Sequence, residues 1–195
     1  INPIAQTYVA PMVKEQVNNA INGSVDYDSL RINWNGDVVL NDVVIKDRDG
    51  HLVGTAQDVA VGVKLSSLPS IIGGNTSGAT AISSIKVESP DLHIWQLVDG
   101  SWSIEKLVKP SDPNKSGSFD GDITINNGRV ALRTKDGIKR NVESLDGTMA
   151  LNMGGMSKGA FTADVDGSSV ALNGNIDMNH VSNFDLFVQA DEIDT

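Results

Sequence analysis

The stretch from Val38 to Leu107 decides the fold, and it begins Val38-Val-Leu-Asn-Asp-Val-Val-Ile-Lys-Asp-Arg-Asp-Gly50. The segments Asp58-Val-Ala-Val-Gly-Val-Lys-Leu65 and Ile85-Lys-Val-Glu-Ser-Pro-Asp-Leu-His-Ile-Trp95 follow it. Apolar and polar residues alternate along these segments, a period typical of strands with one apolar and one polar face. Asp-Gly and Asn-Gly pairs between alternating segments predict tight hairpin turns. The region is therefore predicted to form antiparallel strands.

One strand of this region changes its alternation. Val38 and Leu40 share one parity, whereas Val43 and Ile45 have the other. One extra residue would return the later apolar side chains to the first face, so a β-bulge is predicted near Asn41-Asp42.

The first 23 residues differ, because their apolar residues recur every three to five positions. This spacing predicts an N-terminal helix with one apolar stripe, kinked or restarted at Pro11 and stopped at Gly23. The stripe is expected to pack on the sheet, with contact to a membrane or a partner helix as the alternative.

Residues 109–118, Lys-Pro-Ser-Asp-Pro-Asn-Lys-Ser-Gly-Ser, have the composition of a linker. They divide the chain into an N-terminal region, residues 1–108, and a run of strands and turns, residues 119–195. The second region contains no amphipathic helix to cover an apolar sheet face. Its sheet must close as a β-sandwich or barrel, or curl into a groove. Aromatic residues at 5% and 19 glycines favour the strongly bent, curled sheet.

Composition excludes several classes of protein. With 15 Lys and Arg against 25 Asp and Glu, the net charge is -10, which argues against nucleic acid and against general attraction to an anionic membrane. The chain of 195 residues has no cysteine, so it has neither disulfides nor thiolate metal sites. No apolar run is long enough to span a bilayer and no signal peptide is present, so an envelope protein with this sequence would be a piece without its anchor.

No motif of catalysis is found, and the chain is predicted not to be an enzyme and to bind no cofactor. His51, His93 and His180 lie far apart, and none has a second ligand at metal-binding spacing. The runs Asp47-Arg-Asp-Gly50 and Asp164-Val-Asp-Gly167 resemble calcium loops but lack the Glu of the twelfth position. Both are interpreted as hairpin turns.

The order of strand, turn and short helix in residues 1–107 resembles the AsmA-like and TamB family of envelope proteins. The segment Pro90-Asp-Leu-His-Ile-Trp95 and the turn Asp99-Gly100-Ser-Trp102 carry most of the resemblance, and residues 119–195 match more loosely. The resemblance implies a mostly β protein whose curled antiparallel sheet forms a taco-like groove. It implies a periplasmic location, anchored to the inner membrane by an N-terminal helix absent from this chain.

The resemblance also implies a function in lipid transport, with phospholipid as the ligand and an outer-membrane β-barrel assembly protein, like TamA, as a partner contacted through other parts. The apolar groove would shield acyl chains between the inner and outer membranes. The predicted lining residues are Ile32, Val38, Leu40, Val43, Ile45, Val61, Val63, Ile85, Val87, Leu92, Ile94, Ile123, Ile125, Val130, Leu132, Phe161, Val165, Val170, Leu172, Leu186 and Val188.

Two other functions remain open from the sequence. A scaffold or chaperone for outer-membrane proteins would pair an incoming strand with a sheet edge. A surface adhesin or carbohydrate-binding module would need exposed aromatic platforms, for which Trp34, Trp95 and Trp102 are the tryptophan candidates; Trp34 and Trp102 are expected in the core.

Overall fold

The structure is a computed structural model that describes residues 21–33, 37–64, 82–107, 120–152, 155–177 and 184–190. The elements in chain order are β1 (Gly23–Asp26), β2 (Ser29–Ile32), β3 (Val38–Asp47), β4 (Leu52–Val63), β5 (Ile82–Glu88), β6 (Asp91–Trp95), α3 (Ser103–Leu107), β7 (Asp120–Arg133), β8 (Lys139–Asn152), β9 (Met156–Val165), β10 (Ser168–Asp177) and β11 (Phe184–Ala190). The predicted N-terminal helix and the linker 109–118 lie outside the described residues.

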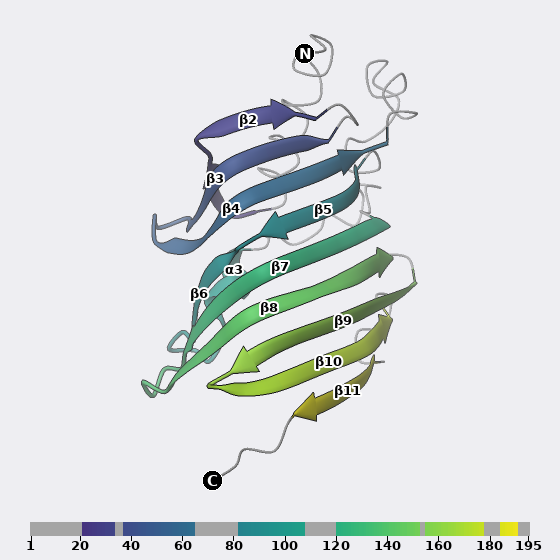
Figure 1. The fold of residues 1–195 in the computed structure, drawn as a ribbon. Coiled ribbons are helices and arrows are strands. Elements are labelled where there is room, and N and C mark those ends of the chain that lie inside the picture. Colours follow the sequence, from purple (N-terminus) through teal and green to yellow (C-terminus); the bar gives the residue numbers. More distant parts are fainter. Residues whose placement is uncertain are drawn as a thin grey trace.

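All the strands belong to one sheet, in the order β1-β3-β4-β5-β7-β8-β9-β10-β11, with β2 beside β3 and β6 between β4 and β7 (Figure 1). The prediction of a mostly β protein is confirmed. A single sheet replaces the sandwich alternative. Strands from both sides of the predicted linker share this sheet, because β7 pairs with β5 and β6.

The sheet is mixed rather than purely antiparallel, which corrects the sequence prediction. β5 and β6 both run parallel to β7, whereas the other pairs are antiparallel. After β6 the chain passes through α3 and residues 108–119, and it starts β7 beside β5. This long connection returns the chain to the level where β5 began, as a parallel pair requires.

β5 and β6 together behave as one interrupted strand. Both pair with β4 in the same register on one side and with β7 in the same register on the other. Ser89 and Pro90 form the interruption, since Ser89 has a φ of 47° and proline has no amide hydrogen for the ladder. The carbonyl of Pro90 still accepts a hydrogen bond from the amide of Arg129, at 2.7 Å.

Tight turns occur where Asp-Gly pairs predict them. The β9–β10 hairpin turns at Asp166 and Gly167, whose φ angles are 50° and 90°. Two consecutive positive φ angles are the signature of the type I′ turn, which suits the twist of a hairpin. Gly137 and Gly100, in the turns after β7 and β6, also have φ angles of 87°.

A crease crosses the sheet where strands change their alternation. Asp42 in β3, Ser89 between β5 and β6, Asn127 in β7 and Ser144 in β8 all have φ angles between 47° and 51°. The pairings on either side place Asp42, Ser89 and Asn127 on one line across the strands. A left-handed residue turns the following side chains to the other parity, so the strands that contain one keep their apolar residues on one face across this line.

The crease explains the change of alternation that predicted a bulge near Asn41-Asp42. The predicted register shift is absent there, since Asn41 lies opposite Asp58 and Val43 lies opposite Ala56. The face is restored instead by the left-handed φ of Asp42. The register between β3 and β4 shifts later, between Ile45 and Lys46.

A polar ladder runs beside the crease on the opposite face of the sheet. Cross-strand partners place Ser29, Asn41, Asp58, Glu88 and Asn126 in one row. The amide of Asn41 donates to Asp58, and the amide of Asn126 donates to Glu88 at 2.9 Å. The first bond joins the neighbouring strands β3 and β4, and the second joins β5 and β7 across the predicted linker.

The most buried apolar cluster lies in the N-terminal half of the sheet. Its members come from β3, β4 and the start of β5, and they lie on both sides of the crease. The buried members are Val38, Leu40, Val43, Ala56, Val61 and Ile82. Residues from both parities of β3 thus pack together, which places them on one face.

The ladder predicts a dependence of stability on pH. A hydrogen bond and ion pair from Lys86, 2.6 Å away, and the hydrogen bond from Asn126 lower the pKa of Glu88 below its ordinary value of 4.5. A lowered pKa in the folded protein stabilises it fully above the ordinary pKa, and this contribution is lost as the pH falls through the folded pKa. Urea unfolding of the Glu88→Gln variant should therefore show a smaller loss of stability on acidification than the wild type.

Glu143→Gln is the matched control, because Glu143 is an exposed residue of the same type on β8. Equal loss of stability in the wild type and Glu88→Gln between neutral pH and about pH 3 would show that the ladder carries no such linkage.

Candidate functional site: the apolar face of the sheet

Two continuous rows of mostly apolar residues cross nine strands on one face of the sheet. Each residue of a row lies directly opposite the next, so the side chains of a row share a face. The first row is Leu30, Leu40, Val59, Val87, Ile125, Gly147, Phe161, Leu172 and Val188. The second row is Ile32, Val38, Val61, Ile85, Ile123, Met149, Gly159, Gly174 and Leu186. We call this surface the apolar face.

A third row lies beyond the crease and crosses seven strands. It consists of Val25, Ile45, Gly54, Leu92, Val130, Val142 and Val165. Ile94 and Leu132 form a further pair next to it. Packing of Ile45 and Val25 against the cluster that contains Val38 and Leu40 places this row on the apolar face as well.

The predicted lining residues therefore lie together. All of them belong to one of these rows or pair next to one, as Val170 does opposite Ala163. For Val63, the structure describes the backbone pairing with Ile82 but not the side chain. Several members were missed by the sequence analysis, among them Met149 and Val142. Their alternation was visible, but only the pairing to Ile123 and Val130 shows which face they share.

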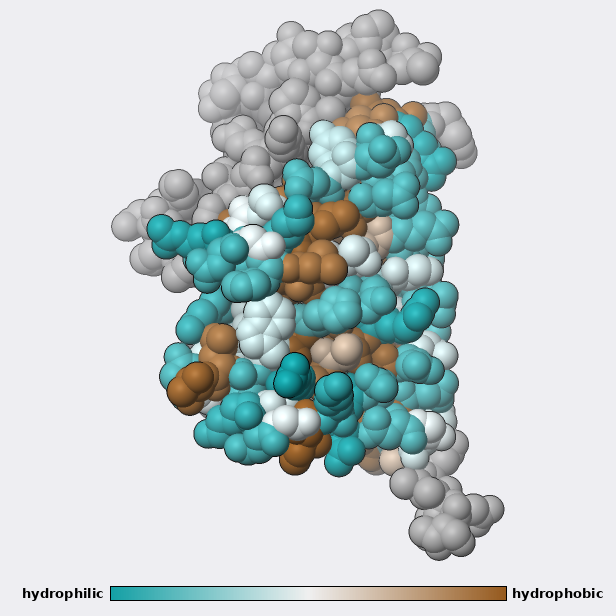
Figure 2. All heavy atoms as spheres, turned by 90° about the vertical axis from the view of Figure 1, so that its left-hand side faces the viewer, coloured by the Kyte–Doolittle hydropathy of each residue, from teal (hydrophilic) through white to brown (hydrophobic). Residues whose placement is uncertain are grey.

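Exposure of the apolar face increases toward the C-terminal end of the sheet. Val38 is fully buried and Leu40 is 5% exposed, whereas Leu186 and Val188 are 56% and 55% exposed. Figure 2, which views the molecule from the left side of Figure 1, shows hydrophobic patches one above another near the middle, with hydrophilic atoms around and between them. The surface thus changes from a packed core at β3 and β4 to accessible apolar side chains at β11.

Glycines on this face leave room for large neighbours. A Cβ atom on Gly147 would lie 2.3 Å from Cδ1 of Phe161, and one on Gly159 would lie 3.0 Å from Cε2 of the same ring. The ring of Phe161 therefore lies over the β8 and β9 backbone instead of standing upright. Because Gly147 and Gly159 have no side chains, the apolar face is flatter around these two positions.

The opposite face of β7 to β11 carries a hollow of about 830 Å³ with polar and apolar lining residues. Most of its lining side chains have the other parity and include Thr124, Thr148, Lys158, Asn173 and Asp185. The hollow also reaches Gly159, Gly174 and Leu186 of the second apolar row, so it meets the predicted apolar lining at Leu186. Phe187, 63% exposed, is the one large hydrophobic side chain on the polar face that borders it.

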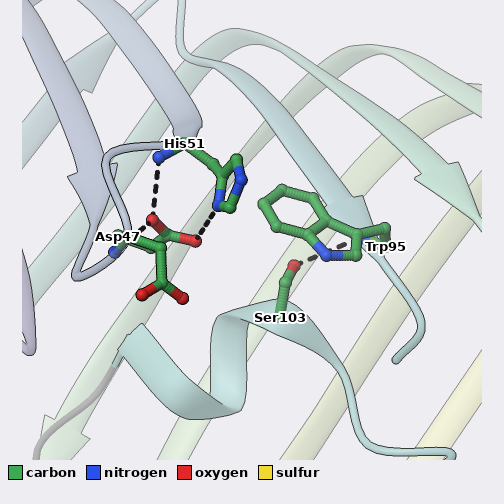
Figure 3. A network of polar contacts seen from close by, with 5 residues as sticks. Asp47, His51, Trp95 and Ser103 are labelled. Atoms are coloured by element: carbon green, nitrogen blue, oxygen red, sulfur yellow. Dashed lines mark hydrogen bonds and ion pairs between the residues drawn. The ribbon is translucent and has the colours of Figure 1, made fainter. Parts of the chain in front are cut away.

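The turn between β3 and β4 brings together three potential metal ligands. Ligand atoms of Asp47, Asp49 and His51 lie within 4.8 Å of one another. The carboxylate of Asp47 already accepts hydrogen bonds from the amides of Asp49 and His51, at 2.9 and 2.8 Å, and it contacts Nδ1 of His51 at 3.0 Å (Figure 3). This is the hydrogen bonding of a closed turn.

The pKa of Asp47 reflects the same contacts. Partial burial acts to raise the pKa, but hydrogen bonds from the amide and the ring of His51 lower it more, so the net shift is downward. The turn also contacts β6, because the rings of His51 and Trp95 meet edge to face with centroids 6.2 Å apart. Trp95 is partly buried and its amide is hydrogen bonded to Oγ of Ser103 in α3, so it does not form a free aromatic platform.

Comparison with known proteins adds nothing to this geometry: no protein-family model matches the sequence, and no curated protein matches it significantly. Among the residues that the structure describes, no helix is both long and apolar enough to cross a bilayer.

The close packing around Gly147 predicts that no larger residue fits at this position without strain. A methyl group at Gly147 would meet the Phe161 ring and also the carbonyl oxygen of Ala160, 2.4 Å away, which cannot rotate aside. Gly147→Ala should therefore destabilise the protein by about 1–3 kcal/mol in urea unfolding. Thr148→Ala, on the adjacent exposed position of the other face, should change stability by less than about 0.5 kcal/mol. Similar stabilities of the two variants would contradict this packing.

Proposed function

We propose that this chain shields phospholipid acyl chains on its apolar face during their transport between two membranes. The observation that carries the proposal is the continuity of the two apolar rows across nine strands. Each methylene group removed from water gains about 0.8 kcal/mol, so an acyl chain of ordinary length gains far more than thermal energy from an apolar surface.

The length of the rows favours movement of acyl chains along the apolar face over storage of one chain at a fixed place. Nine strands at about 4.8 Å per strand extend over about 38 Å, whereas one leaflet of a bilayer is about 15 Å thick. An acyl chain lying along the rows would contact only part of them. Repeated aliphatic side chains without a charged interruption offer it many similar positions, which suits sliding.

The resemblance to the AsmA-like and TamB family supports the cellular setting that we propose. In that setting the chain belongs to a periplasmic protein anchored in the inner membrane, with a TamA-like outer-membrane assembly protein as a partner. The hollow has no role in this proposal, because most of its lining side chains lie on the face opposite the two apolar rows.

A charge on the apolar face should prevent lipid binding. Val188→Arg places a cation at the accessible end of the first row, where Val188 is 55% exposed and the fold tolerates the longer side chain. Native mass spectrometry of the purified protein after incubation with phosphatidylethanolamine should show bound lipid in the wild type and much less in Val188→Arg.

Gln189→Arg is the matched control, since Gln189 is the next residue of β11, is exposed, and has the opposite parity. It should bind lipid like the wild type. Loss of lipid in both variants, or in neither, would remove the apolar face from the binding site.

A second function is favoured by the exposed edge of the sheet. β11 is last in the strand order, and its Leu186, Phe187 and Val188 are all more than half exposed. An edge strand with apolar side chains and no lysine or proline can pair with an incoming strand. We propose strand addition at β11 as the alternative, in the sense of a scaffold for outer-membrane proteins.

Solution scattering separates the two functions. If β11 pairs with other strands, the chain should associate as its concentration rises, and residues 184–190 should become protected from hydrogen exchange. Phe187→Lys should weaken this association, because edge lysines oppose pairing, and it leaves the apolar face unchanged. A monomer at all concentrations, with residues 184–190 already protected, would exclude strand addition.

A further inference from the structure

Two tight loops lie side by side at the end of the sheet seen on the left of Figure 1. One is the β7–β8 hairpin, residues 133–140, and the other is the loop after β6, residues 97–101. The amide of Gln96 donates to the carbonyl of Arg133 at 2.8 Å, and the amide of Lys135 contacts Oε1 of Gln96 at 3.4 Å. We call these two loops together the basic tip.

Both loops are closed by their own hydrogen bonds. In the hairpin, the amide of Thr134 donates to the carbonyl of Ile138 at 2.9 Å, and the amide of Ile138 donates to Oγ1 of Thr134 at 3.1 Å. In the other loop, the amide of Leu97 donates to the carbonyl of Ser101 at 2.8 Å. The side chains at the basic tip are thus presented from defined turns.

Each loop presents one aliphatic side chain to solvent. Val98 is 96% exposed and Ile138 is 52% exposed. Single exposed aliphatic residues are ordinary on protein surfaces. Here two of them stand on adjacent tight turns, where Gly, Asn and Asp are the usual residues.

The hairpin concentrates positive charge in an acidic protein. Arg133, Lys135, Lys139 and Arg140 are four of the 15 Lys and Arg residues of a chain whose net charge is -10. Within the hairpin, Asp136 is the single acidic residue. Folding alone does not account for this arrangement, since Arg133 lies directly opposite Lys139, and like charges in opposed positions destabilise a sheet.

Most of these cations have no acidic partner in the described part of the chain. Arg140 pairs with Asp166 at 3.3 Å, and Asp99 of the neighbouring loop pairs with Lys106 at 3.5 Å. Among the residues that the structure describes, Arg133, Lys135 and Lys139 make no ion pair. The carboxylates elsewhere on the protein are screened beyond about 8 Å at physiological ionic strength.

We propose that the basic tip docks on the surface of an anionic phospholipid bilayer. The cations would contact lipid phosphates, while Val98 and Ile138 would enter the boundary between headgroups and acyl chains, as in interfacial membrane anchors. The positive charge of the hairpin favours an anionic surface. The exposed aliphatic side chains of Val98 and Ile138 favour a surface with an apolar interior beneath it. Docking does not depend on lipid binding to the apolar face.

Co-sedimentation with vesicles tests the charge. The whole chain should bind vesicles of equal parts phosphatidylcholine and phosphatidylglycerol, and should not bind vesicles of phosphatidylcholine alone. Each neutralised cation should weaken binding about fivefold, so Lys135→Gln and Lys139→Gln combined should weaken it about 25-fold. Lys158→Gln, an exposed lysine on β9, should bind like the wild type. Equal binding to both kinds of vesicle, or no effect of the hairpin substitutions, would overturn the proposal.

Site-specific fluorescence tests the orientation. The chain has no cysteine, so Val98→Cys, Ile138→Cys and Thr148→Cys each carry one environment-sensitive dye at a known place. The dyes at positions 98 and 138 should shift to the blue on anionic vesicles, and the dye at 148, on the polar face, should not. A shift at 148 without shifts at the other two would show that a different surface docks. Val188→Arg should leave docking unchanged, which separates this result from the lipid-binding proposal.

Discussion

The parallel pairing of β7 with β5 and β6 holds this sheet together. In the described structure, residues on either side of the predicted linker meet along this pairing and through side-chain hydrogen bonds beside it, and β7 contacts both strands along its length. Its register sets Val87 against Ile125 and Leu92 against Val130. A shift of one residue would turn every apolar side chain of one half to the polar face. The continuity of the apolar face therefore depends on this single junction.

The crease keeps the apolar face continuous at an energetic cost, because it places non-glycine residues in the left-handed region. A non-glycine residue in the left-handed region is disfavoured, and Asn and Asp accept it best because their short polar side chains bond locally. Asn127 illustrates the compensation, since its amide donates to Asp146 at 2.8 Å and its side chain to Oγ of Ser89 at 3.3 Å. The polar ladder next to the crease adds hydrogen bonds between the same strands.

Much of the strand content could be predicted, because alternation such as that of Val59 and Val61 reports a strand whatever its neighbours are. The parallel pairs could not, since parallel and antiparallel strands with one buried face share the same period. The change of parity at Asn41-Asp42 was visible, but its cause was not. A bulge and a left-handed residue both turn a side chain over, and only the pairing of Val43 with Ala56 separates them.

The interrupted strand formed by β5 and β6 has a mechanical consequence. Pro90 donates no hydrogen bond, and Ser89, Asp42 and Asn127 align with it across the neighbouring strands. A sheet with several irregular backbone positions on one line bends most easily about that line. The first two rows of the apolar face lie on one side of the crease, and the third row lies on the other. Bending at the crease would change the angle between these two parts while the strand pairing within each part is kept. For the proposed function, the width of the apolar face would then depend on the stiffness of the backbone at the three left-handed positions of the crease.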